Sequence, residues 1–363
     1  MAHFGGANHA AGRGYNGYNN STGIPLESSP VPSTVRYHVP IQRELLDVGI
    51  FKDTIFPSLS VHAPLAVIAY GIGRATNSVE AKDWLWPLAP MVNGWWSAIG
   101  RKVYVRGLTF GQAFGTLSRP ERLLLTGVTL WGGRLFYRIA SRSLKRRREG
   151  KGTDDARYEV QKREEGFWNK AFFTLFLPEA VIQTIISLPI TAPFHHQGAV
   201  LTGYHPAVQA AAVGLFSAGF ALEVLADTQL EKFKDTAEDD RSVCKEGVWS
   251  LVRHPNYLGD ALVHLSFPLL LYGSDMLAPV EILGAIANYL FLRYVGGDKQ
   301  TERHQHRRYS ESNPEKFADF QKRKESHNSF WPKSDVLTNK WLWTIVAAGV
   351  AGAAVEQTIH QLI

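Results

Sequence analysis

The chain has 363 residues, of which 45% are hydrophobic and 20% charged, and its formal net charge is +6. This composition excludes a wholly disordered or collagen-like chain, and a single cysteine, Cys244, excludes an intramolecular disulfide framework or a multi-cysteine zinc site. The basic excess suits nucleic acid, anionic lipid or the cytosolic loops of a membrane protein, and only the placement of the charges distinguishes these partners.

The N-terminal segment predicts a disordered tail over residues 1–45. Six glycines fall among the first 23 residues, mixed with Asn, Ala and Tyr, and a Ser/Pro-rich stretch follows. Such a segment has too little apolar surface to form a core. It lacks the basic start and apolar run of a secretory signal peptide, so we expect none.

Eight apolar segments then recur along the chain, at 56–72, 84–99, 123–140, 167–190, 207–226, 257–272, 277–295 and 341–355. A bilayer core of roughly 30 Å is crossed by about 20 mostly apolar residues in a helix. Three of the segments meet that length and five are shorter or more polar. Their number in one chain predicts an all-α, polytopic transmembrane helix bundle with about seven to eight spanning segments.

The charges between these segments predict a topology. Segments 141–166, 227–253 and 296–338 are long and rich in Lys and Arg, whereas 191–204 and 273–277 contain neither residue. The three basic segments are therefore expected on the cytosolic side. The stretch 101–122 carries five basic residues on the expected outer side, so either the second apolar segment does not span or one of the first is re-entrant. The basic run 145–148 follows an apolar helix directly, which favours lipid headgroups over nucleic acid.

The stretch 247–260, GVWSLVRHPNYLGD, has the strongest functional signal. Pro255 suits the first position of a helix, which places His254 near its N-cap. Asn256 and Asp260 lie four residues apart and share a helix face, as do Arg253 and Tyr257. Basic side chains at a helix N-terminus favour an anion. Asp260 lies one turn inside an apolar segment, where an ionisable group is costly unless it faces a polar cavity.

This stretch resembles the signature of membrane reductases that share the steroid 5-alpha-reductase C-terminal domain, a group that includes the DUF1295 proteins and the sterol C14- and delta-7-reductases. A second similarity is Glu223 followed by Ala226-Asp227-Thr228-Gln229, and a weaker third one is Glu302 followed by spaced aromatics and Phe330-Trp331-Pro332. The resemblance covers roughly residues 123–333. It implies divergent N-terminal membrane helices over 46–122, a steroid-reductase-like membrane domain over 123–333 and a C-terminal membrane helix over 334–363.

The resemblance also implies NADPH-dependent reduction of a carbon–carbon double bond in a lipid substrate that enters from the bilayer. The positions that match the cofactor pocket of the family are Asp227, Gln229, Trp249, Arg253, His254, Asn256, Tyr257 and Asp260. Tyr257 is the candidate catalytic proton donor. Two positions depart from the family pattern, Leu230 where a Lys is usual and Lys234 where an Arg is usual, and they put the phosphate contact in doubt.

Two alternatives stay open from sequence. Isoprenylcysteine and phospholipid methyltransferases share an Arg-His-Pro-x-Tyr-x-Gly element and use S-adenosylmethionine. A non-catalytic, lipid-binding protein of the same fold is also compatible with the departures. No metal site is expected, although His195, His196 and His205 follow the fourth segment. The basic loops and the missing presequence favour the endoplasmic reticulum membrane.

Overall fold

The computed structural model describes residues 51–150, 158, 161–195, 205–236 and 242–362. The predicted tail over 1–45 lies outside these residues. The described part of the chain consists of helices and connecting turns and has no strand. The all-α prediction is therefore confirmed. The described residues belong to one compact unit, Pro40–Ile363.

The first half of this unit contains α2 Phe56–Thr76, α3 Ala81–Trp95, α4 Arg101–Arg106, α5 Phe110–Gly115 and α6 Arg119–Arg148. The second half contains α8 Phe167–Ala171, α9 Leu177–Ile186, α10 Leu188–Thr191, α11 Pro206–Thr236, α12 Pro255–Gly273, α13 Ile282–Leu290, α14 Asp298–Ser312, α15 Pro314–Ser326 and α16 Lys340–Leu362. Single π-helical turns precede α2, join α3 to α4 and α8 to α9, and end α13. Every predicted apolar segment lies largely within one helix or a run of joined helices.

Local signals explain several of the helix ends. Ser118 and Glu121 form a capping box at the start of α6, in which the carboxylate of Glu121 accepts hydrogen bonds from the backbone N–H and hydroxyl of Ser118. Asn77 ends α2 in the left-handed conformation, a role that Asn tolerates better than most residues. α12 begins at Pro255 with His254 as its N-cap, as the sequence predicts.

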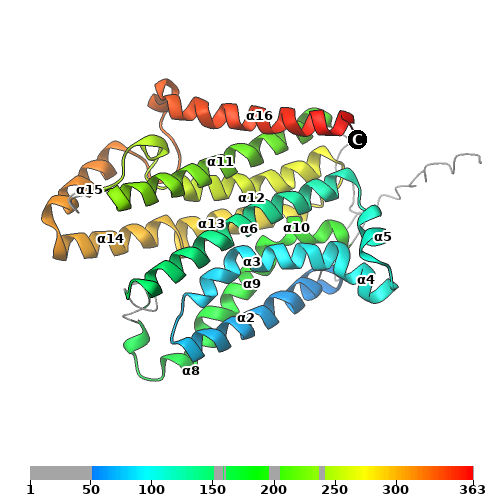
Figure 1. Cartoon of the computed structure of the whole chain (residues 1–363), viewed down its shortest axis with the longest axis horizontal. Helices are drawn as coiled ribbons and strands as arrows, with labels where there is room; N and C mark the ends of the chain where they lie inside the picture. Colours follow the sequence, from blue (N-terminus) through cyan, green and yellow to red (C-terminus); the bar gives the residue numbers. More distant parts are fainter. Residues whose placement is uncertain (1–50, 151–157, 159–160, 196–204, 237–241, 363) are drawn as a thin grey trace, which may run out of the picture. The chain divides into compact units, whose positions relative to one another are not determined.

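Small residues let α11 approach its two neighbours closely (Figure 1). At the crossing of α11 and α12, a Cβ added to Gly259 would lie 2.6 Å from the carbonyl oxygen of Gly219. At the crossing with α16, a Cβ added to Gly349 would lie 2.8 Å from the carbonyl oxygen of Gly214. Such contacts are typical of membrane helix pairs, in which close backbone packing takes the place of a hydrophobic driving force.

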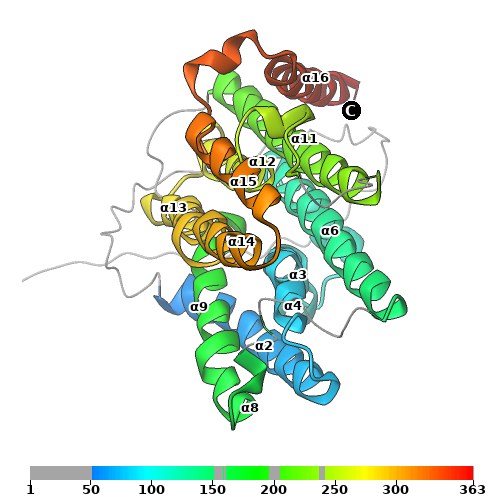
Figure 2. The same cartoon turned by 90° about the vertical axis from the view of Figure 1, so that its left-hand side faces the viewer.

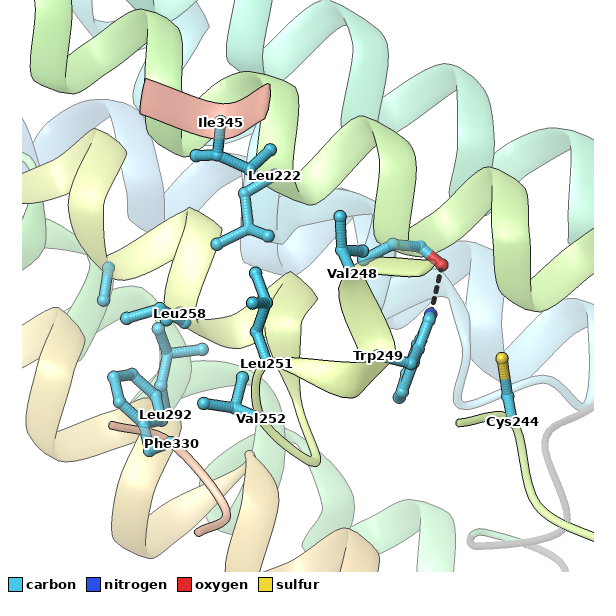
Figure 3. Packing of buried hydrophobic residues seen from close by; sticks show 12 residues of the cluster. Leu222, Cys244, Val248, Trp249, Leu251, Val252, Leu258, Leu292, Phe330 and Ile345 are labelled. Atoms are coloured by element: carbon cyan, nitrogen blue, oxygen red, sulfur yellow. Dashed lines mark hydrogen bonds between the residues drawn. The ribbon is translucent and has the colours of Figure 1, made fainter. Parts of the chain in front are cut away.

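A hydrophobic cluster holds the start of α12 between α11 and the residues that follow α13. Leu222, Val248, Leu258, Leu292 and Phe330 pack together in it, although they come from five different parts of the chain (Figure 3). The cluster fixes the turn Gly247–Ser250 (η6) and the first residues of α12 in one place. Figure 2 shows α14 and α15 lying close to this part of the bundle.

The basic segments gather at one end of the bundle. Lys145 of α6 lies 3.4 Å from Asp235 of α11, and Lys245 binds Asp319 of α15. At the other end, the N–H of His205 donates to the carbonyl of Gly273 over 3.0 Å, and Arg101 contacts His195. This arrangement agrees with the predicted grouping of the basic segments. It also places Arg101 at the end expected from strict alternation.

The predicted number of spans is not confirmed. Among the described residues, three helices are long and apolar enough to cross a membrane: Phe51–Thr76, Pro206–Thr236 and Lys340–Leu362. A fourth would be the pair Phe167–Ile186 and Leu188–Phe194, which is bent by 56°. The remaining apolar segments are less apolar or shorter: α6 carries Arg134 and Arg138, α12 carries Asn256, Asp260 and His264, and α13 has nine residues.

Candidate functional site

The turn before α12 is held against α11 by two hydrogen bonds. Gln229 accepts from the N–H of Val248 over 2.8 Å. The indole N–H of Trp249 donates to the carbonyl of Ala226 over 2.8 Å, and Figure 3 marks this bond with a dashed line. Gly247 has a φ of +67°, and a Cβ there would lie 2.1 Å from the Gln229 side chain. Only glycine fits this close, left-handed turn. In the structure, Gln229 and Trp249 position the turn.

Arg253 is bound by Glu302 of α14 in a bidentate ion pair. The Nε of Arg253 donates to Oε1 of Glu302 over 2.8 Å, and Nη2 donates to Oε2 over 3.0 Å. The remaining Nη1 donates to the carbonyl oxygens of Lys324 and His327. Every nitrogen of the Arg253 guanidinium therefore has a partner, and a bound phosphate would have to share it with Glu302 or displace Glu302.

His254 shares the same carboxylate, because its Nε2 lies 3.1 Å from Oε1 of Glu302. Burial opposes ionisation of Glu302. The hydrogen bond and charge of His254 and the charge of Arg253 outweigh this effect and lower the carboxyl pKa to about 2. Burial also lowers the pKa of His254, and the hydrogen bond to Glu302 opposes that shift only in part.

Tyr257 lies beside this ion pair. Its hydroxyl is 3.1 Å from Oγ1 of Thr301, and its ring stacks on the imidazole of His254 with 5.5 Å between the ring centroids. The candidate proton donor therefore touches two polar side chains, one of which is titratable. A phenol held in this way can pass a proton to a group that lies against it.

A second polar cluster lies further along α12, centred on Asp260. Oδ1 of Asp260 is 2.8 Å from Nδ1 of His264, one turn later, and accepts a hydrogen bond from Nδ2 of Asn288 of α13 over 3.3 Å. The rings of His264 and Trp131 are nearly perpendicular, with 4.6 Å between the ring centroids. Asp260 is 5% exposed and His264 is 1% exposed, so this carboxylate is buried and has polar side chains beside it.

Arg134 of α6 joins this region to α11. Its Nη1 donates to Oε1 of Glu223 over 2.9 Å, and its Nη2 donates to Oδ2 of Asp227 over 2.6 Å. The Nε of Arg138 lies 2.9 Å from the same oxygen of Asp227. The predicted residue Asp227 is thus part of a buried ion network, in which two arginines are balanced by two carboxylates.

Several buried polar atoms around Asp260 have no hydrogen-bond partner in the described part of the chain. They are Oε2 of Glu223, Oδ1 of Asn256, Nε2 of His264, Oδ1 of Asn288 and the indole nitrogen of Trp131. An unpaired buried polar group costs about 1–3 kcal/mol, so native proteins seldom gather several of them in one region without a ligand or water to satisfy them. The cluster therefore has the chemistry of a polar binding site inside an apolar bundle.

The structure thus distributes the predicted residues over three places. Asp227, Asn256 and Asp260 belong to the cluster around Asp260, which we call the inner cluster. Arg253, His254 and Tyr257 lie around Glu302, in what we call the Glu302 cluster. Gln229 and Trp249 belong to the packing of the turn. The sequence prediction missed Arg134, Arg138, His264 and Asn288. Charged or histidine side chains within apolar segments are the signal that would have found three of these residues.

The comparisons with known proteins give one result. A family model described as "Protein of unknown function (DUF1295)" matches residues 69–324. No curated protein and no solved structure matches the chain. The matched range includes both polar clusters and ends before α16.

Proposed function

This chain belongs to the DUF1295 family, and we propose that it is an integral membrane oxidoreductase that uses NADPH to reduce a carbon–carbon double bond in a lipid. The membrane part rests on three to four helices that are long and apolar enough to span a bilayer. The chemistry rests on the inner polar cluster, and the endoplasmic reticulum is the proposed location because of the basic segments at one end of the bundle.

The observation that carries the proposal is the set of unpaired buried atoms around Asp260. A nicotinamide carboxamide and the ribose hydroxyls offer both donors and acceptors, which these atoms need. Asn256, Asp260 and Asn288 would hold the amide and ribose groups, and Arg253 with His254 would lie nearer the phosphates. NADPH supplies a hydride when it is bound.

Reduction of a double bond also requires a proton on the second carbon. Tyr257 would supply it, because its hydroxyl is already hydrogen-bonded to Thr301 and its ring stacks on His254. His254, which lies 3.1 Å from Glu302, would return the proton from solvent. A hydride from NADPH and a proton from Tyr257 would together saturate the double bond.

A second candidate function is a non-catalytic lipid-binding protein of the same fold. One observation favours it: the carboxylate of Glu302 and two backbone carbonyls already bind all three nitrogens of the Arg253 guanidinium. In the inner cluster, Arg134 and Arg138 are likewise paired with carboxylates. A phosphate would have to compete for each of these cations.

Titration of the detergent-purified protein with NADPH, NADH and S-adenosylmethionine tests these candidates. We expect saturable binding of NADPH, with an affinity for NADH weaker by about tenfold, the effect of one charge-assisted contact to the extra phosphate. Binding of S-adenosylmethionine alone would favour the methyltransferase. If none of the three ligands binds, and a cooperative thermal melt shows that the protein is folded, the non-catalytic candidate is favoured.

A further inference from the structure

A second site is formed by α6, α11, α12 and α16, at a different place from the polar clusters. These helices border a cavity of about 660 Å³. Its size is within the range of about 300–1,000 Å³ that is typical of sites for small ligands. The side that α16 provides lies outside the residues that match the family, 69–324, so this cavity includes a part of the chain that the family match does not cover.

The interior of the cavity is apolar. Leu130, Phe216, Phe267 and Val355 are among the side chains that line it. The small residues Gly127, Ala212 and Gly352 also line the cavity. Such a lining binds hydrocarbon by removing it from water or from less well packed lipid, and it offers few polar groups that would select a water-soluble ligand.

Charged groups lie at one end only. Arg119, at the start of α6, is bound by both oxygens of Glu356 over 2.6–3.0 Å and also donates to Gln209 over 2.9 Å. Arg122, one turn later, is exposed. Its guanidinium lies over the ring of Phe114 at 5.4 Å and pairs with no carboxylate in the described part of the chain. His360 is also at the cavity lining. The local excess of charge is therefore positive.

The length of the cavity suits one lipid chain. Its lining on α6 runs from Arg119 to Leu130, which at 1.5 Å per helical residue is about 17 Å. The hydrocarbon half-thickness of a bilayer is about 15 Å. A chain from one leaflet would fill the apolar part, and its headgroup would then lie at the end where Arg122 is exposed.

We propose that this cavity binds one anionic phospholipid, with an acyl chain between α6, α11, α12 and α16 and the phosphate at Arg122. This lipid site is independent of the proposed reductase activity, because it follows from the lining, the length of the cavity and the charge of Arg122, which no carboxylate in the described residues balances. α16 and α6 would be bridged by the lipid in addition to the Arg119–Glu356 ion pair.

Native mass spectrometry of the detergent-purified, delipidated protein tests this proposal, with phosphatidylglycerol and phosphatidylcholine of identical chains as probes. We expect one phosphatidylglycerol to bind with an affinity about fivefold higher than phosphatidylcholine, since one basic residue at a membrane surface contributes about 1 kcal/mol. Equal affinity for the two lipids in the wild-type protein would overturn the assignment of the headgroup.

Two variants and their matched controls locate the lipid. Arg122→Gln should remove the preference for phosphatidylglycerol, whereas Arg106→Gln, an exposed arginine of α4, should keep it. Val355→Trp should fill the cavity and weaken both lipids. Val350→Trp, on the same helix and similarly exposed (66% against 59%) but outside the lining, should not. A thermal melt confirms folding. Unchanged binding in Arg122→Gln or Val355→Trp would overturn the proposal.

Discussion

Glu302 binds Arg253 with both carboxylate oxygens, at 2.8 and 3.0 Å, although 49 residues separate the two in the sequence. The same carboxylate lies 3.1 Å from His254. This contact attaches α14 to the residues that begin α12. It brings the stretch 247–260, which resembles the reductase signature, against the polar helix that follows α13. Its removal gives the first prediction.

Glu302→Gln should destabilise the protein by about 3 kcal/mol, because it leaves the largely buried Arg253 without its counter-charge. The matched control is Glu311→Gln, which changes an exposed carboxylate of the same helix and should have little effect. Thermal melts in detergent measure both. Equal melting temperatures for the two variants would show that the ion pair contributes no stability.

The pH dependence of stability should show the same contact. The pKa of Glu302 is lowered from 4.5 to about 2, so the unfolded chain binds a proton in this range before the folded chain does. The stability that the ion pair contributes is therefore complete above pH 4.5 and is lost as the pH falls toward 2. We expect the difference in melting temperature between wild type and Glu302→Gln to shrink over this interval. A constant difference would contradict the assignment.

Asp260→Asn should lower the affinity for NADPH by about tenfold or more, the scale of one lost charge-assisted hydrogen bond. The change removes a charge and keeps the size of the side chain, so the protein should still fold. Asp235→Asn, an exposed position of α11, serves as the control. Unchanged affinity in a folded Asp260→Asn variant would remove Asp260 from the proposed cofactor site.

Gly259→Ala should destabilise the crossing of α11 and α12 by about 1–3 kcal/mol, as overpacking does. The added Cβ would lie 2.6 Å from the carbonyl oxygen of Gly219 and 2.8 Å from the nitrogen of Glu223. Gly133→Ala in α6 is the opposite case, because nothing lies within 4 Å of its added Cβ. Alanine should stabilise that helix by up to about 1 kcal/mol. A stabilised Gly259→Ala would show that the crossing is looser than described.

Cysteine labelling tests the predicted topology, after Cys244 has been replaced. Cysteines at Gly150 and Lys322 should react from one side of the membrane, because the basic segments gather at one end of the bundle. A cysteine at Tyr104, whose side chain is 82% exposed near the other end, should react from the opposite side. Labelling of positions 150 and 322 from different sides would contradict the topology.

The sequence determined the helical elements and the position of the candidate functional stretch, 247–260. Apolar segments of helical length predict helices because backbone polar groups in an apolar environment must bond to one another within the segment. Pro255 predicts the start of α12, since a proline at the first helical position loses no backbone hydrogen bond and already has a helical φ. A carboxylate in an apolar segment marks Asp260, because its burial is costly without polar partners.

The partners of these residues depended on the tertiary structure. Arg253 was predicted to be available for a phosphate, but the position of α14 brings Glu302 against it. His264 and Asn288 join Asp260 only because α12 and α13 pack side by side, and Arg134 reaches Glu223 from α6. Hydrogen bonds and ion pairs act over a few ångströms, so they depend on which helix faces meet, and spacing along a single chain does not contain that information.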